Sequence, residues 1–193
     1  MLKALYDWTM RMAGHRRAMP ALFGVSFIES SFFPIPPDVM VVPMVLADKT
    51  KAFRIALVCT LGSVLGALLG YAIGALLYEA AARPLIEFYG YGEAFRDFTR
   101  RYNEWGAWIV AGAALTPFPY KVITIASGAV GLDIWVFVIA SILARGLRFY
   151  VEAALLWRYG PPIRAFIEGN LKFVTTAFFC LLIGGFVVIK YLV

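Results

Sequence analysis

Two apolar segments of this chain, residues 20–47 and 107–132, are each interrupted by clustered prolines. Proline lacks the backbone N–H that a helix needs, and its ring clashes with the preceding turn, so neither segment can form one unbroken helix. At about 1.5 Å per residue, residues 20–33 would make about 21 Å of helix and residues 38–47 about 15 Å. Both lengths fall short of the about 30 Å of hydrocarbon in a bilayer. Each segment is therefore predicted to enter the membrane and return to the same side as a re-entrant hairpin.

The two proline clusters belong to a longer internal repeat. Pro117 follows Pro34 by 83 residues, and at the same offset Lys121 corresponds to Asp38. The repeated unit is a broken hairpin followed by a crossing helix. One crossing separates the copies, so the second hairpin is predicted to enter from the opposite face, as an inverted repeat whose elbows meet near the midplane. The elbow residues are Pro34, Pro36, Pro37, Pro117 and Pro119.

Lipid must surround much of this chain. Apolar residues are 62% of the 193 and the mean hydropathy is +0.78, whereas soluble domains contain about 45–50% apolar residues. We predict an all-α integral membrane protein with a single domain, residues 1–193. Its predicted parts are a basic amphipathic helix at the interface (1–19), hairpin 1 (20–47), a transmembrane helix (52–78), an interfacial segment (79–106), hairpin 2 (107–132) and two further transmembrane helices (134–157 and 173–190).

The basic residues indicate the orientation of the chain rather than a nucleic-acid partner. The net charge is +6, but Lys and Arg are scattered between apolar runs, without an arginine-rich block or an aromatic RNA-binding motif. Ten of them lie in residues 1–19, 48–54 and 158–172, which are predicted to share one side. The positive-inside bias places that side, and the N-terminus, in the cytoplasm. The sequence has no metal-ligand spacing, and neither a metal nor a cofactor is expected.

Four glycines recur at every fourth position of the first long apolar run. They are Gly62, Gly66, Gly70 and Gly74, and they form one stripe along a helix. A face without side chains lets a neighbouring helix approach closely. Tight packing within the chain is the favoured interpretation, and association of two copies into a homo-oligomer is the alternative.

Six ionisable residues fall at predicted membrane depth. An isolated charge there costs about 2.5–3.5 kcal/mol on insertion scales, so these side chains must face one another or a wet cavity. Arg148 and Glu152 are spaced i, i+4 and are predicted to pair, with Glu152 as a structural partner. Asp38 and Lys121 hold equivalent elbow positions, where approximate symmetry would bring them together and leave Arg145 free. The six are Glu29, Asp38, Lys121, Arg145, Arg148 and Glu152.

These charges admit two interpretations. Glu29 and Asp38 are acids beside a helix break in the membrane, which is a natural position for a proton-carrying residue. Lys121, Arg145 and Arg148 are candidates to bind a lipid phosphate, for which arginine offers two parallel donors. The alternative is that these charges only neutralise one another and lock the helices together. No nucleophile with an adjacent base is found, so no enzyme activity is predicted.

Several motifs resemble the DedA family, also called the VTT or SNARE-associated family. The resemblance covers roughly residues 20–160. It implies two opposed re-entrant hairpins and a bacterial inner-membrane location. It also implies a role in moving lipids between leaflets, including undecaprenyl phosphate, with proton coupling in some members. The motifs are Ile28-Glu29-Ser30, Pro36-Pro37-Asp38 and Gly70-Tyr71-Ala72-Ile73-Gly74, with Pro117-Phe118-Pro119-Tyr120-Lys121 and Ala126-Ser127-Gly128 most similar to the shorter YqaA-type branch.

The resemblance assigns Glu29 and Asp38 to the membrane acids of the family. It also places Lys121 near the position where main-branch members have an arginine in the second hairpin. Two positions depart from that branch: Ala114 stands where it has an arginine, and Ala67 where it has an acid. We therefore expect arginines of the next helix to replace the missing positive charge, and the substrate to differ from that of the main branch.

The leading functional prediction is a lipid flippase or scramblase. It would move an anionic headgroup, of undecaprenyl phosphate or of a phospholipid, through a polar groove between the hairpins. The alternatives are a proton-coupled transporter for a small ion or solute, and a membrane scaffold that transports nothing. An open lateral groove favours the first, a closed central cavity the second, and a dry, fully ion-paired interior the third.

Overall fold

The computed structural model describes residue 15 and residues 17–31, 36–115 and 119–169. Within these ranges the regular structure is entirely helical. Most of the predicted amphipathic helix (1–19) and all of the predicted last transmembrane helix (173–190) lie outside the described residues. The elements are α2 (Ala18–Ser31), α3 (Asp38–Ala47), the 3₁₀ turn η1 (Lys49–Lys51), α4 (Ala52–Leu77), the π-helical turn η2 (Tyr78–Ala82), α5 (Arg83–Phe88), α6 (Gly92–Leu115), α7 (Tyr120–Ala129) and α8 (Ile134–Gly169).

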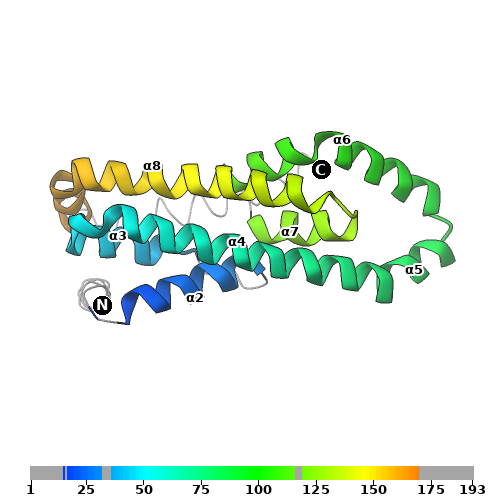
Figure 1. Cartoon of the computed structure of the whole chain (residues 1–193), viewed down its shortest axis with the longest axis horizontal. Coiled ribbons are helices and arrows are strands. Elements are labelled where there is room, and N and C mark those ends of the chain that lie inside the picture. Colours follow the sequence, from blue (N-terminus) through cyan, green and yellow to red (C-terminus); the bar gives the residue numbers. More distant parts are fainter. Residues whose placement is uncertain (1–14, 16, 32–35, 116–118, 170–193) are drawn as a thin grey trace.

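Two helical runs in the described part of the chain are long and apolar enough to cross a membrane. One runs over Lys49–Phe88 with a mean hydropathy of 2.0, and the other over Ile134–Gly160 with a mean hydropathy of 1.7. They lie side by side along the long axis of the molecule as α4 and α8 (Figure 1). This agrees with the predicted transmembrane segments 52–78 and 134–157.

Both runs extend further than the sequence indicated. The first continues past residue 78 through η2 and α5, and α8 continues through Pro161 and Pro162 to Gly169. The predicted transmembrane helix ended at residue 157, ahead of these prolines, which remove backbone donors and crowd the preceding turn. Beyond the hydrocarbon, water can satisfy the carbonyl groups that proline leaves without a donor, so a helix can continue there.

The four glycines of α4 are packing positions within the chain. A Cβ atom at Gly62 would lie 2.6 Å from the carbonyl oxygen of Phe23 on α2, and one at Gly66 would collide with the carbonyl of Phe27. Further along α4, a Cβ at Gly74 would collide with a carbonyl of α7. The stripe therefore lets the backbones of α2 and α7 lie directly against α4. A second copy of the chain is not needed to explain it.

α2 runs parallel to α4. The Ser26 hydroxyl donates to the Cys59 carbonyl at 2.6 Å, and the Ser30 and Ser63 hydroxyls are 2.7 Å apart. Both contacts join residues 33 apart in the sequence, and a constant offset along two helices requires parallel directions. The start of α2, the end of α3 and the start of α4 also line one hollow at the same end of the bundle. The first predicted hairpin therefore starts and finishes at the same end of the bundle, because α2 begins there and α3 ends there.

Prolines begin the second arm of each predicted hairpin. Pro37 is the N-cap of α3, with φ −66°, and Pro119 is the N-cap of α7, with φ −61°. The first amides of a helix have no intrahelical acceptor, so proline at its start removes no hydrogen bond. The elbow residues Pro34 and Pro117 lie outside the described residues.

α6 joins two segments that the sequence separated. It runs unbroken over Gly92–Leu115, across the predicted boundary between the interfacial segment and hairpin 2. Gly106, at the predicted boundary, is a contact point inside the helix, because a Cβ there would collide with the Leu132 side chain. At the end of α7, Gly131 has φ +64°, where glycine is favoured, and Asp133 caps α8 by accepting from the amides of Trp135 and Val136 at 2.9 Å.

Each long helix packs against both predicted hairpins. α4 contacts α2 of the first and α7 of the second, while α8 contacts α6 of the second and α3 of the first. The outer surface of α4 carries exposed leucines at every fourth position, each 37–50% exposed: Leu57, Leu61, Leu65 and Leu69. A row of exposed leucines opposes solubility in water and suits contact with lipid.

Candidate functional site

Arg145 lies in the centre of the bundle, with 1% of its side chain exposed. Its Nη2 donates to Glu29 Oε2 on α2 at 2.7 Å, and its Nε donates to Ser63 Oγ on α4 at 2.5 Å. The guanidinium carbon also lies 4.9 Å from the ring centre of Tyr120 on α7 and 4.8 Å from that of Phe149. One arginine of α8 thus contacts three other helices, and aromatic faces add a cation–π attraction to the ion pair.

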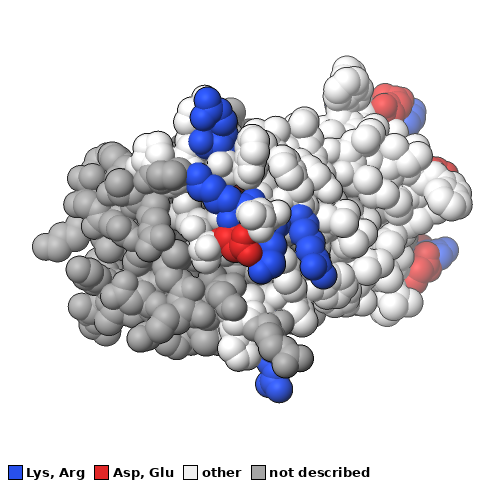
Figure 2. Space-filling view, turned by 60° about the vertical axis from the view of Figure 1, so that its left-hand side comes forward, with Lys and Arg blue, Asp and Glu red and all other residues white. Residues whose placement is uncertain are grey.

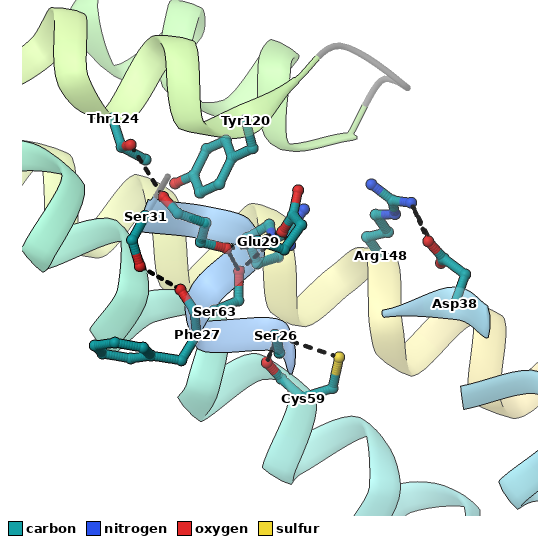
Figure 3. Close-up of polar contacts among 12 residues, drawn as sticks. Ser26, Phe27, Glu29, Ser31, Asp38, Cys59, Ser63, Tyr120, Thr124 and Arg148 are labelled. Carbon is teal, nitrogen blue, oxygen red and sulfur yellow. Dashed lines mark hydrogen bonds and ion pairs between the residues drawn. The ribbon is translucent and has the colours of Figure 1, made fainter. Parts of the chain in front are cut away.

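Two serines complete the polar surroundings of this ion pair. Ser30 Oγ donates to Glu29 Oε2 at 3.0 Å, and Arg145 Nη2 reaches Ser30 Oγ at 3.4 Å. Ser30 and Ser63 are themselves in contact and fully buried. We call Glu29, Ser30, Ser63 and Arg145 the central cluster; Figure 3 shows its Glu29 and Ser63. A buried ion pair with its remaining polar groups satisfied is stable in a low-dielectric interior, where a single member would not be.

The ends of the two predicted hairpins meet beside this cluster. Thr124 Oγ1 on α7 donates to the carbonyl oxygen of Ser30, near the end of α2, at 3.1 Å (Figure 3). Carbonyl groups in the last turn of a helix lack intrahelical donors, so this bond satisfies one of them. Tyr120, the first residue of α7, is also buried and donates to Ser141 on α8 at 2.6 Å. α2, α7 and α8 are joined at this level by hydrogen bonds.

A second ion pair lies nearer the surface. Arg148 Nη2 donates to both carboxylate oxygens of Asp38, at 3.1 and 3.3 Å, and the two side chains are 28% and 29% exposed (Figure 3). Asp38 begins α3, where the positive end of the helix dipole favours an acid. Glu152 lies one turn further along α8, close to Asp38 and Arg148. Of the two acids near Arg148, Asp38 forms the ion pair.

Arg148 and Glu152 also line a shallow groove on the side of α8. We call it the lateral groove; its volume is about 450 Å³, and it is lined by Leu115, Leu147, Arg148, Val151, Glu152 and Leu155. It is open at the surface, since Leu147 is 57% exposed and Leu155 is 51% exposed. A mostly apolar groove that a guanidinium also lines suits a molecule with an apolar chain and an anionic group, although the carboxyl group of Glu152 shares the lining.

The structure corrects the pairing predicted among the six membrane charges. Arg145 was predicted to be free, but it is paired with Glu29. Arg148 was predicted to pair with Glu152, but its ion pair is with Asp38. Both pairs join an acid of the first hairpin to an arginine of α8, which lies 110 or more residues away in sequence. No spacing rule within one helix can reveal such pairs.

Lys121 lies in the first turn of α7 and is half-buried. Its carbonyl oxygen accepts a hydrogen bond from the Thr124 hydroxyl at 2.9 Å. Lys121 was predicted to pair with Asp38, but Asp38 forms its ion pair with Arg148. A role for Lys121 in headgroup binding stays a prediction.

Ser63 and Tyr120 belong to the site, although neither was predicted from the sequence. The available signal was weak: Ser63 is a single hydroxyl beside Gly62 in a long apolar run, on the face that the glycine stripe marks as a contact surface. Within the described residues, no group of three or more His, Cys, Asp or Glu side chains is placed to hold a metal ion. The site therefore consists of two ion pairs, hydroxyl groups and aromatic rings.

Comparison with known proteins identifies the family to which these features belong. The VTT domain matches residues 33–158. A protein of Haemophilus influenzae is 32% identical over 186 residues, which cover 96% of each chain, and bears the name "Uncharacterized protein". A Histophilus somni protein named as a homologue of an uncharacterized protein is also 32% identical, over 96% of this chain and 97% of its own. No solved structure matches.

Proposed function

The chain belongs to the VTT domain (DedA) family of membrane proteins, a family associated with membrane transport or lipid flipping, and from this membership we propose that it moves an anionic lipid headgroup between bilayer leaflets as a flippase or scramblase. The substrate class is undecaprenyl phosphate or a phospholipid. The membrane is the bacterial inner membrane, with the N-terminus in the cytoplasm.

The observation that carries this proposal is the lateral groove. Its apolar lining includes the exposed Leu147, Val151 and Leu155 of α8, and Arg148 brings a guanidinium to the same lining. A lipid could keep its acyl chain in the bilayer while its phosphate contacts the guanidinium, which binds phosphate through two parallel hydrogen bonds. Arg145 is then a positioning residue rather than a headgroup ligand, because Glu29 and two serines already bind its Nε and Nη2 and its side chain is 1% exposed.

We propose that the two hairpins enter the membrane from opposite faces, as an inverted repeat. Support comes from the parallel course of α2 and α4, from the hollow shared by the two ends of the first hairpin, and from the Thr124–Ser30 contact where the hairpins meet. Irregular backbone at membrane depth is tolerated where protein covers it, and a packed hairpin tip meets that condition. Transporters with inverted repeats carry their substrate sites at such midplane junctions.

A proton on Asp38 would free Arg148. The carboxylate of Asp38 holds Arg148 by two hydrogen bonds. Protonation would remove the ion pair and leave the guanidinium free for a lipid phosphate. Glu29 is a weaker proton candidate than the sequence suggested, since it is held by the buried Arg145.

The test is lipid flux in liposomes that contain the purified chain. Fluorescent phosphatidic acid on the inner leaflet is protected from dithionite until it crosses. The chain should accelerate its loss relative to empty liposomes, and an inward pH gradient should change the rate. Asp38→Asn should make the rate insensitive to the gradient, because an amide neither ionises nor holds Arg148 by charge. Wild-type flux equal to that of empty liposomes would support a scaffold, to which the closed central cluster is also suited.

A further inference from the structure

A separate hollow lies at the end of the bundle where α2 and α4 begin and α3 ends. Its volume is about 710 Å³, within the range of about 300–1,000 Å³ typical of small-molecule sites. We call it the interfacial hollow, because the candidate membrane-spanning run that contributes to it begins at Lys49, and basic residues at the end of such a run are expected near the boundary between lipid and water. The lining that matters here is Phe23, Met44 and Ile55, which are apolar, and Asp48, Lys51 and Arg54, which are charged.

The charged residues leave the interfacial hollow with one uncompensated positive charge. Lys51 Nζ lies 2.7 Å from Asp48 Oδ2, so these two neutralise each other. Hydrogen bonding from Lys51 lowers the pKa of Asp48 to about 2, and Asp48 is therefore ionised at neutral pH. Arg54 is exposed and forms no ion pair with any residue that the structure describes. Figure 2, turned toward this end of the molecule, shows a group of basic side chains with acidic atoms among them.

We propose that the interfacial hollow binds an anionic lipid. Its phosphate would contact the Arg54 guanidinium, and the first part of an acyl chain would lie against Phe23 and Ile55. A site with an apolar wall and a cation at headgroup depth matches a phospholipid better than a free anion, which has no use for the apolar lining. Residues 1–14 are the other candidate occupant, but they contain Lys3 and Arg11 against one acid, Asp7. Their net positive charge is repelled by Arg54.

Lipid binding at this hollow does not require that the chain transport lipid, and it is tested by binding alone. The probe is phosphatidic acid with a photoactivatable diazirine near its headgroup, added to the full chain in phosphatidylcholine nanodiscs. Peptide mass spectrometry then maps the adducts after illumination. Adducts should fall in residues 44–58 and should decrease about tenfold in Arg54→Gln, because the loss of a charge-assisted pair is of the order of 1.4 kcal/mol, which is tenfold in affinity.

Two variants serve as controls. Lys49→Gln removes a charge from the same end of the molecule, from a residue that does not line the hollow, and should leave the adducts unchanged. Arg148→Gln removes the proposed transport contact and should also leave them unchanged. An equal loss in Lys49→Gln would show diffuse surface attraction, and an unchanged yield in Arg54→Gln would show that another segment fills the hollow. Displacement of the probe by equimolar inorganic phosphate would show a free-anion site. Each of these results overturns the proposal.

Discussion

Arg145 on α8 and Glu29 on α2 form a buried ion pair of 2.7 Å across 116 residues of sequence. The side chains are 1% and 15% exposed. This pair connects the first predicted hairpin to the second long helix at the level where α7 also arrives. It explains how a chain with several charges at membrane depth can be stable there: the deepest arginine has its acid, two hydroxyl groups and two aromatic rings around it.

Removing the charge of one partner in this ion pair should destabilise the protein strongly. Arg145→Gln leaves Glu29 as an unpaired buried charge, and such losses cost about 3–5 kcal/mol. We expect a large fall in folded yield and thermal midpoint, measured by fluorescence-detected size exclusion in detergent. The double variant Glu29→Gln/Arg145→Gln removes both charges and should recover much of the loss. If the double variant is no more stable than Arg145→Gln, then the unpaired charge of Glu29 is not what destabilises Arg145→Gln.

The glycine stripe gives a second stability test. In Gly66→Ala the new methyl group would collide with the Phe27 carbonyl, which is backbone and cannot swing away. Overpacking of this kind costs about 1–3 kcal/mol. Gly24→Ala is the matched control, because a Cβ at that position of α2 meets no atom within 4 Å. The thermal midpoint should fall for Gly66→Ala and stay level or rise for Gly24→Ala. Equal midpoints would contradict the close approach of α2 to α4.

The inverted repeat predicts the sides of two turns. Position 48, between α3 and α4, should be cytoplasmic, and position 133, between α7 and α8, should be periplasmic. Single cysteines at these positions, in a background without Cys59 and Cys180, can be labelled with a membrane-impermeant maleimide in intact and in opened cells. Asp133→Cys should react in both preparations, and Asp48→Cys only after the cells are opened. Labelling of both positions from the same side would rule out opposed hairpins.

Asp48 provides a pH-dependent contribution to stability. Its pKa is lowered from 3.8 to about 2 by the hydrogen bond from Lys51 and by that from Thr50. A lowered pKa stabilises the folded state above the unfolded pKa, and this stabilisation is lost as the pH falls from about 4 to about 2. The difference in thermal midpoint between the wild type and Asp48→Asn should therefore be constant above pH 5 and shrink below pH 4. The same difference at pH 2.5 and pH 7 would contradict the assignment.

The sequence was sufficient to predict the elements whose causes are local. Clustered prolines break a helix wherever they occur inside one, and uncharged runs of more than 20 residues are long enough to cross a bilayer. These rules anticipated α3, α4, α7 and the first part of α8. They did not predict α6, which crosses the boundary placed between residues 106 and 107; Gly106 there is a contact with Leu132 inside the continuous helix.

For the charged residues, too, the sequence predicted local properties but not tertiary partners. Their depth could be predicted, because hydropathy places them in apolar runs, and so could the need for partners. Their partners could not, because Arg145 and Arg148 lie one turn apart on α8 and only packing decides which acid each one meets. The rule of i, i+4 pairing favoured Glu152 for Arg148. Asp38 takes that place, because the start of α3 brings its carboxylate to α8 from another part of the chain.

The most direct test of the proposed transport is the ratio of anionic to zwitterionic lipid flux in Arg148→Gln. Fluorescent phosphatidic acid and phosphatidylcholine are followed in the same liposomes, with the dithionite assay, for the wild type, for Arg148→Gln and for Arg158→Gln. Arg158 is an exposed arginine of the same helix outside the lateral groove. We expect Arg148→Gln to lower phosphatidic acid flux about tenfold, a loss of about 1.4 kcal/mol in transition-state stabilisation, and Arg158→Gln to transport lipid like the wild type. Wild-type phosphatidic acid flux in folded Arg148→Gln would contradict this expectation.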